Sequence, residues 1–235
     1  MLTIAALLVG LFLIAFLLGS IPWGVVISKV FYHKDLRDEG SGNIGTTNAM
    51  RSMGKVGGGV VFVLDFGKGL AAGWVGTLFA DMLALAVVDA ISHGYTELLV
   101  FATPELDASA LAMTLAFAGC TLGHIFSPWL GWKGGKGIAV AAACLVFVYG
   151  PVGFLIEIAC FVIGIAVTRC VSVGSIAAAV ACPILGLYFY WGHWVSWLII
   201  LAMACVVIWA HRENIARLRA GTENKIGSKK KAENA

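Results

Sequence analysis

Charged residues are scarce in this sequence. Only 12% of its 235 residues are Asp, Glu, Lys or Arg, whereas 60% are hydrophobic. A soluble globular domain carries charge on about 25% of its residues, and so few charges could not cover this much apolar surface in water. The composition therefore excludes a soluble enzyme, a disordered chain and a fibre. At about 20 residues for each membrane span, the apolar residues suffice for about seven spans.

Metal-binding and redox patterns are absent as well. The six cysteines are scattered through apolar stretches without a Cys-x-x-Cys pair, and we interpret them as small packing residues. The sequence holds no HExxH motif and no cluster of carboxylates, so neither a metal nor a cofactor is expected. It also lacks a long internal repeat, which disfavours the transporter folds that are built from repeats.

The apolar runs predict an all-α, polytopic integral membrane protein with seven transmembrane helices. Spans are expected at 1–31, 56–80 and 108–126. The first begins without Lys or Arg and is far longer than the apolar core of a signal peptide, so it is predicted to remain as a membrane helix. Four more spans come from the stretch 138–210, if it is divided at three breaks: Gly150–Pro151, Arg169–Ser175 and Trp191–His193.

The distribution of charge predicts the orientation. In the seven-span arrangement, 15 of the 16 basic residues lie on one side of the membrane and Lys68 lies inside a span, whereas the segment 81–107 carries five acidic residues and no base. Because basic loops face the cytoplasm, the N-terminus is expected outside and the C-terminus in the cytoplasm. We thus expect one membrane-embedded domain, 1–228, with an extracytoplasmic insertion loop at 81–107 and a basic cytoplasmic tail at 229–235.

Three polar, glycine-rich segments lie on the predicted cytoplasmic side. The first, 40–48, matches the spelling GxGxxG but follows a charged loop rather than a strand, so it does not indicate a dinucleotide fold. Its glycines can free backbone N–H groups for an anion, and Arg51 can bind phosphate through two N–H groups. The alternative is a flexible linker. The candidate residues here are Ser41, Gly42, Asn43, Gly45, Asn48 and Arg51.

The second segment is 123–137, which contains Lys133 and Lys136 within a run of glycines. It is not a nucleotide-binding P-loop, because Gly137 stands where Ser or Thr is required. The lysines and the glycine backbone could form a compact anion site, or the lysines could only set the topology. The candidate residues are Gly131, Lys133, Gly134, Gly135, Lys136 and Gly137.

The third segment begins at His211, where the last span meets the cytoplasm. His211 and Asn214 are three residues apart and share a face if the helix continues, so an imidazole and an amide could orient or deprotonate a substrate hydroxyl. The alternative is a helix end with a basic cap.

Several other polar residues are weaker candidates. Ser172 and Ser175 could join an anion site or cap a helix. Asp65 and Lys68, three residues apart inside a span, are expected to form an internal ion pair. Glu157 stands alone in another span, where it could be hydrogen-bonded or protonated.

Three anion-binding loops at one edge of a helical bundle suit a substrate with a phosphate head and an apolar tail. A transporter or flippase and a lipid-binding subunit without chemistry are the alternatives. Together the stretches GSGNIGTTNAMR, GHIFSPWLGWKGGKG and HRENIARLRAGTENKI resemble the acyl-phosphate–glycerol-3-phosphate acyltransferase family, bacterial membrane enzymes of phospholipid synthesis. The resemblance spans residues 8–228 and departs from the usual pattern at Ser127, where the family has proline, and in the long segment 81–107.

The resemblance implies an O-acyltransferase that moves a fatty acyl group from acyl phosphate to the sn-1 hydroxyl of glycerol 3-phosphate and forms lysophosphatidic acid. It implies catalytic roles for Ser41, Arg51, His211 and Asn214, and glycerol 3-phosphate binding by the segment 131–137. A serine in 172–175 also aligns, and either Ser172 or Ser175 could be the one in the site. The expected partners are the two substrates and membrane lipid, without nucleic acid. We expect a monomer in the bacterial plasma membrane, with its active site at the cytoplasmic face.

Overall fold

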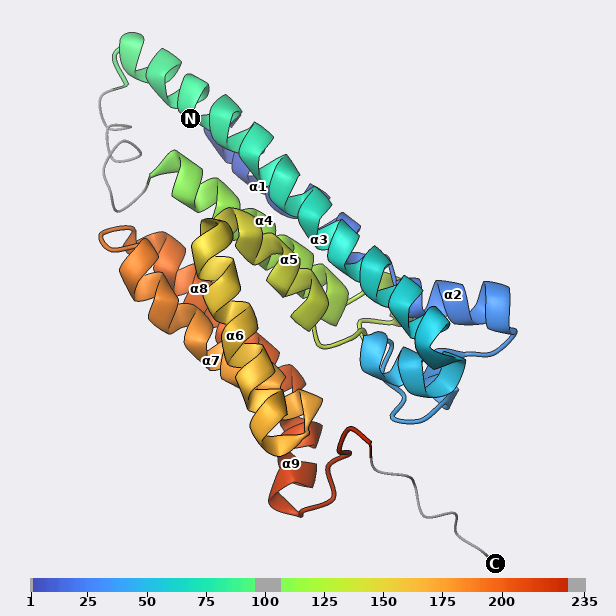
Figure 1. Cartoon of the computed structure of the whole chain (residues 1–235). Coiled ribbons are helices and arrows are strands. Elements are labelled where there is room, and N and C mark those ends of the chain that lie inside the picture. Colours follow the sequence, from blue (N-terminus) through green and yellow to red (C-terminus); the bar gives the residue numbers. More distant parts are fainter. Residues whose placement is uncertain (1, 96–106, 228–235) are drawn as a thin grey trace, which may run out of the picture.

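The computed structural model describes residues 2–95 and 107–227, and these residues form helices without a strand (Figure 1). The helices are α1 (Leu2–Ser20), α2 (Trp23–Tyr32), α3 (Thr46–Ser92), α4 (Ala108–Ile125), α5 (Ile138–Val148), α6 (Gly150–Thr168), α7 (Val171–Phe189), α8 (Trp194–Ala210) and α9 (Arg212–Arg219), with 3₁₀ turns η1 (Leu36–Asp38) and η4 (Pro128–Leu130). Helix α4 packs against α1, α3, α5 and α8, whereas α6 and α7 pack against each other. The all-α prediction is confirmed.

Five helical segments are long and apolar enough to cross a membrane, and they are Leu2–Tyr32, Thr46–Ser92, Ala108–Leu130, Gly150–Thr168 and Val171–Phe189. Helices α8 and α9 give a sixth if this pair, bent by 55°, is one span. Helix α5 is apolar but only about 16 Å long at 1.5 Å per residue, about half the thickness of the hydrocarbon core. Within the described ranges, five or six candidate spans are thus shown, and the predicted count of seven is not confirmed.

The three breaks predicted within 138–210 are confirmed. Helix α5 ends just before Gly150, which has a φ of 67°. Arg169, with a φ of 61°, ends α6, and residues 190–193 separate α7 from α8. These positive φ values end a right-handed helix because an L residue rarely adopts them within one.

The first predicted span is confirmed as one candidate span, Leu2–Tyr32, but the expectation of one uninterrupted helix over 1–31 is wrong. Helix α1 ends at Ser20, and α2 begins at Trp23 and lies at an angle to α1 (Figure 1). Pro22 is the cause, because it lacks an N–H and disfavours the helical conformation at Ile21.

The predicted loop at 81–107 is wrong for its first part. Helix α3 continues through this region to Ser92. The reason is its apolar face, on which Leu83 and Val87 are buried against Ile4 of α1. Residues 96–106 and the predicted tail at 229–235 lie outside the described residues.

Glycine allows the closest helix contacts in the bundle. A Cβ on Gly123 of α4 would lie 2.0 Å from the Phe16 carbonyl oxygen of α1, and one on Gly19 of α1 would lie 2.0 Å from the Cys120 carbonyl oxygen of α4. Membrane helices often use small residues in this way, because their association depends on close packing rather than on the hydrophobic effect. The α1–α4 pair holds the N-terminal part of the chain against the centre of the bundle.

We predict that Gly123→Ala destabilises the protein by about 1–3 kcal/mol, the usual effect of overpacking. Gly67→Ala is the matched control, because a Cβ on Gly67 would meet nothing within 4 Å and alanine is the better helix former. Thermal unfolding of both variants in detergent measures the difference. Equal melting temperatures for the two variants would show that the α1–α4 contact is less tight than described.

Candidate active site

One cavity of about 400 Å³ lies between the two sides of the bundle, a size typical of small-molecule sites. Its wall combines the segment 41–51 with parts of α3, α4, α5, α6, α7, α8 and α9, and it includes the buried Asp65 and His124. Along α7 the lining residues include Ser172 and Ser175 in the first turns and end with Ala179 and Cys182 further into the helix. One end of the cavity is therefore polar and the deeper end is apolar.

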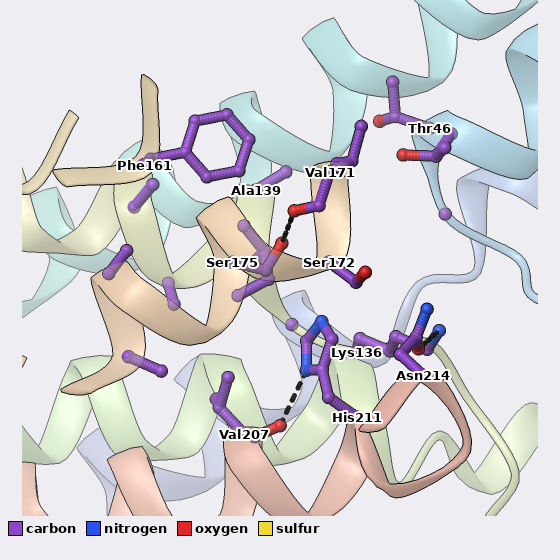
Figure 2. A pocket seen from close by; sticks show the side chains of 18 of the residues that line it. Thr46, Lys136, Ala139, Phe161, Val171, Ser172, Ser175, Val207, His211 and Asn214 are labelled. Carbon is purple, nitrogen blue, oxygen red and sulfur yellow. Dashed lines mark hydrogen bonds between the residues drawn. The ribbon is translucent and has the colours of Figure 1, made fainter. Parts of the chain in front are cut away.

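The cavity brings together candidates from all three glycine-rich segments. The predicted site residues in its wall are Ser41, Asn43, Gly45, Asn48, Arg51, Lys136, Gly137, Ser172, Ser175, His211 and Asn214. Figure 2 shows Lys136, His211 and Asn214 facing Ser172 and Ser175 across this space, with Thr46 on a third side. The predicted residues outside the wall are Gly42, Gly131, Lys133, Gly134 and Gly135.

Asn48 organises the first segment. Its side-chain oxygen accepts a hydrogen bond from the Ser41 N–H at 2.9 Å, and its amide nitrogen donates to the Leu36 and Glu39 carbonyl oxygens. The side chain is only 2% exposed. These bonds fold the segment into a fixed loop, so the structure gives Asn48 a positioning role and excludes the flexible-linker interpretation.

Arg51 follows this loop and faces the cavity. No carboxylate in the described part of the chain forms an ion pair with it. In contrast, Arg37 pairs with Asp35 at 2.7 Å on the outside of the same region. The Arg51 guanidinium is thus available to an anion in the cavity.

The structure gives Gly134 and Gly135 a packing role rather than the anion-binding role that their spacing predicts. Their N–H groups donate to the Ile125 and His124 carbonyl oxygens at 2.9 and 3.0 Å, so neither is free for a ligand. A Cβ on either residue would lie within 2.1 Å of an atom of His124. The glycine pair lets the chain fold back onto the end of α4, and this fold places Lys136 at the cavity.

The cavity-facing lysine begins a chain of polar contacts. Lys136 donates a hydrogen bond to the side-chain oxygen of Asn214. The Asn214 amide donates to Glu223 at 2.7 Å, and the Arg217 guanidinium donates to the other oxygen of Glu223, also at 2.7 Å. Arg217 and Glu223 line the cavity too. Sequence reasoning did not select these two as site residues, although both lie within the third recognised stretch.

Charge in this chain of contacts favours an anionic ligand. Burial lowers the pKa of Lys136, and the nearby positive charges of Arg217 and Arg51 lower it further. Burial alone would raise the pKa of Glu223, but hydrogen bonds from Asn214 and Arg217 outweigh it and lower this pKa. Glu223 therefore stays ionised, while three cations around the cavity remain under-neutralised. An entering phosphate group would relieve their mutual repulsion.

His211 presents one nitrogen to the cavity. Its Nδ1 lies 2.8 Å from the Val207 carbonyl oxygen (Figure 2), so Nδ1 carries the proton and donates it. In the neutral ring, Nε2 is then the acceptor. The side chain is 3% exposed, and burial lowers the pKa of His211 to about 4. At neutral pH this residue can accept a proton.

Two buried hydroxyl groups in the wall, those of Thr46 and Ser172, donate to no backbone carbonyl among the described residues. The Ser172 hydroxyl is close enough to Glu223 to help lower the pKa of that carboxyl. Ser175, in contrast, donates to the Val171 carbonyl oxygen at 3.0 Å. Because buried polar groups are normally paired, Ser172 rather than Ser175 is the serine available to a ligand.

The predicted Asp65–Lys68 ion pair is confirmed, with 2.9 Å between Lys68 Nζ and Asp65 Oδ1. The same ammonium lies 3.0 Å from His124 Nδ1 and donates to the Ile21 carbonyl oxygen at 2.7 Å. All three side chains are at most 6% exposed. Sequence reasoning missed His124, although the residue lies within the second recognised stretch. Across residues 2–95 and 107–227, no group of three or more His, Cys, Asp or Glu side chains is placed to hold a metal ion.

The chain is similar to known proteins over nearly its whole length. Residues 9–221 match the model of a family described as glycerol-3-phosphate acyltransferase. A glycerol-3-phosphate acyltransferase of Listeria monocytogenes is 35% identical over 93% of this chain and 96% of its own, and one of Rhodopseudomonas palustris is 38% identical over 97% of both. The structure is also similar to a crystal structure of PlsY, an integral membrane glycerol 3-phosphate acyltransferase, in the glycerol 3-phosphate form. The TM-score is 0.72 and the sequences are 31% identical. This match covers 94% of the present chain and 96% of PlsY.

We predict that Lys136→Met weakens binding of glycerol 3-phosphate at least about tenfold, because a hydrogen bond to a charged group contributes about 1.5–3 kcal/mol. Lys133→Met removes the same charge three residues away, outside the cavity wall, and should leave the affinity unchanged. Isothermal titration of both variants in detergent measures the dissociation constants. Equal losses in the two variants would mean that the lysines act only through general charge.

Proposed function

We propose that the acyl donor is an acyl phosphate and that the acceptor is the sn-1 hydroxyl of glycerol 3-phosphate. The premise is that the chain belongs to the glycerol-3-phosphate acyltransferase family and is an integral membrane acyltransferase of glycerol 3-phosphate. The products are then lysophosphatidic acid and inorganic phosphate. One observation supports this proposal most strongly: the cavity joins a cationic end, with Arg51, Lys136 and Arg217, to an apolar end between α5, α6, α7 and α8. Phosphate groups fit the first end and an acyl chain fits the second.

The reaction needs two phosphate-bearing substrates in one cavity, where their negative charges repel. Arg51, Lys136 and Arg217 offset this repulsion, and the hydroxyls of Thr46 and Ser172 supply further donors. Phosphate is already a good leaving group, so positioning and charge stabilisation provide most of the catalysis. We assign Ser41, Asn43 and the backbone of Gly45 to the wall that positions the substrates.

The chemical step is a direct attack. The acceptor oxygen forms a bond to the carbonyl carbon of the acyl phosphate, the bond from that carbon to the phosphate oxygen breaks, and phosphate leaves with the electron pair. The hydroxyl proton passes to His211 Nε2 or to a phosphate oxygen of the substrate. Asn214, held by Lys136 and Glu223, fixes the geometry beside His211.

Ser41 is the alternative nucleophile. No histidine or carboxylate in the described residues hydrogen-bonds to its hydroxyl, and its N–H is used by Asn48. A serine without an adjacent base is a weak nucleophile at neutral pH, so a covalent acyl-serine is not expected.

The topology proposed with this function has seven membrane crossings, with α5 as the short one. The N-terminus is outside and the C-terminus is in the cytoplasm of a bacterium, in the plasma membrane. The cavity then opens at the cytoplasmic face, the side that carries nearly all of the basic residues and where both soluble substrate and donor are accessible. We propose a monomer, because the residues of one chain that line the cavity offer groups for both substrates.

Purified protein should convert acyl phosphate and labelled glycerol 3-phosphate into lysophosphatidic acid, with no product from acyl-coenzyme A. Arg51→Ala should lower kcat/KM by about 10²–10³, the usual effect of removing one charge-stabilising donor. Lys55→Ala is the control and should retain activity, because Lys55 is exposed, lies outside the wall and follows the kink that Gly54 makes in α3. Full activity of Arg51→Ala would refute the site, and turnover of acyl-coenzyme A alone would refute the donor.

Direct attack predicts that the enzyme mixed with acyl phosphate alone remains unmodified. Intact-protein mass spectrometry after rapid quenching detects a mass increase of one acyl group. The absence of this increase, together with turnover when glycerol 3-phosphate is added, agrees with a single-step transfer. An acyl adduct mapped to Ser41 and chased into product by glycerol 3-phosphate would instead establish a two-step mechanism.

A further inference from the structure

Glu157 is a buried carboxyl group in the cavity wall that the proposed reaction does not use. It is 3% exposed, on a helix whose other buried residue is Gly153. Neither oxygen of its carboxyl group has an N–H or O–H donor among the described residues, and the group that reaches it is the Cys182 thiol, a weak donor. A carboxyl in the middle of a membrane helix is costly without a partner, so its retention here requires a reason beyond the fold.

The position of Glu157 is far from the polar end of the cavity. It lies eleven residues before Thr168, the last residue of α6, which is about 16 Å at 1.5 Å per residue. Its neighbour Cys182 lies eleven residues into the antiparallel helix α7, at the same depth. Leu145 and Met203 also line the cavity and belong to the same packed cluster as Cys182. Glu157 is therefore a carboxyl group surrounded mainly by apolar and weakly polar side chains.

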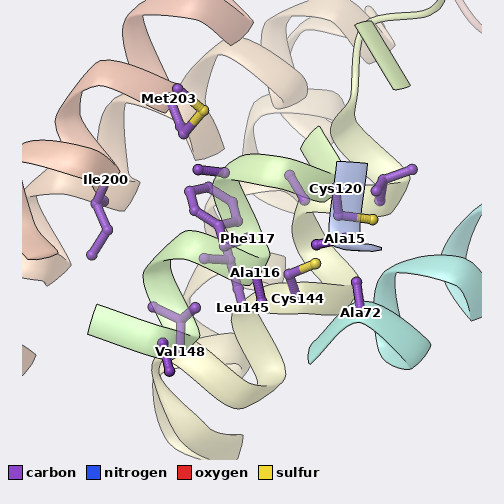
Figure 3. Packing of buried hydrophobic residues seen from close by; sticks show 14 of the residues in the cluster. Ala15, Ala72, Ala116, Phe117, Cys120, Cys144, Leu145, Val148, Ile200 and Met203 are labelled. Carbon is purple, nitrogen blue, oxygen red and sulfur yellow. The ribbon is translucent and has the colours of Figure 1, made fainter. Parts of the chain in front are cut away.

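The neighbouring polar groups do not satisfy this carboxyl. The Tyr149 hydroxyl donates to the Cys182 carbonyl oxygen at 2.6 Å, and the Tyr190 hydroxyl donates to the Val148 carbonyl oxygen at 2.8 Å. Figure 3 shows the packing of Phe117, Leu145, Val148 and Met203, side chains of the same core cluster that offer no hydrogen-bond donor. A further hydrogen-bond partner of Glu157 can therefore approach only from the cavity, which this residue lines.

We propose that Glu157 is a specificity-determining residue that hydrogen-bonds to a hydroxyl group on the acyl chain of the donor, at the depth where the chain passes between α6 and α7. This inference rests on the proposed function, because it places the acyl chain in the apolar end of the cavity. A hydroxyl both donates and accepts, so it can pair with a carboxyl group in either protonation state. Glu157 then favours hydroxylated chains over plain chains of equal length, since a plain chain leaves the carboxyl with only the weak donor of the Cys182 thiol.

The variants are chosen to separate hydrogen bonding from shape. Glu157→Gln keeps a side chain that donates and accepts hydrogen bonds, whereas Glu157→Met keeps the approximate volume and removes both capacities. Replacing an unpaired buried polar group by an apolar one of similar shape is often neutral or stabilising, so Glu157→Met is expected to fold. Its melting temperature in detergent checks this directly.

The substrates are acyl phosphates of one chain length, plain or with a single hydroxyl moved stepwise along the chain. For wild type and Glu157→Gln, one hydroxyl position should raise kcat/KM about tenfold relative to the plain chain, the factor that one net hydrogen bond of about 1.4 kcal/mol supplies. In Glu157→Met the ratio at that position should fall to one or below. A ratio that is equal in wild type and Glu157→Met at every position would overturn the inference.

Binding of the product series distinguishes this failure from failure of the proposed function. Dissociation constants for plain and hydroxylated lysophosphatidic acids are measured by titration on the same three proteins. If the protein turns over no acyl phosphate, the proposed donor is wrong, but a tenfold preference in binding that is lost in Glu157→Met still supports the inference. Turnover of plain chains without any hydroxyl preference in rate or binding retains the function and refutes the role of Glu157.

Discussion

The buried ammonium of Lys68 is the contact on which the arrangement of the site depends. It joins three elements at once: its own helix through Asp65, the end of α4 through His124, and the break between α1 and α2 through the Ile21 carbonyl oxygen. Its three N–H groups are all used, which is what makes a charge tolerable inside the bundle. His124 in turn lies against Gly135, so the loop that delivers Lys136 to the cavity is built on this contact.

The cavity has a cationic end and an apolar end, which suit different parts of the substrates. At one end, cations outnumber carboxylates and free hydroxyls face the space, which favours phosphate. At the other, α5 to α8 supply apolar side chains, which favour an acyl chain. The reacting carbonyl would lie where the two regions meet, near His211 and Asn214. A fold that packs its helices through glycine and other small residues can leave such a space without losing the close contacts elsewhere.

Sequence alone predicted the membrane class, the helical breaks after residue 138 and the segments that meet in the cavity, because each depends on local composition or on a recognisable motif. It did not predict features that depend on tertiary contacts. The glycines at 134 and 135 looked like anion ligands, but their N–H groups are used by α4. The extension of α3 through Leu83 and Val87 depends on burial against α1. Whether α5 crosses the membrane cannot be read from its apolar pattern, because its length is set by the loop before it and by Gly150.

The central claim is that the sn-1 oxygen of glycerol 3-phosphate attacks the carbonyl carbon of an acyl phosphate. Isotope tracing tests it most directly, with ¹⁸O in that hydroxyl of the acceptor and, separately, in the bridging oxygen of the donor. The account predicts that the acceptor label appears in the ester oxygen of lysophosphatidic acid and that the donor label appears in the released phosphate. Loss of the acceptor label from the ester, or a donor label that remains with the acyl group, would contradict it.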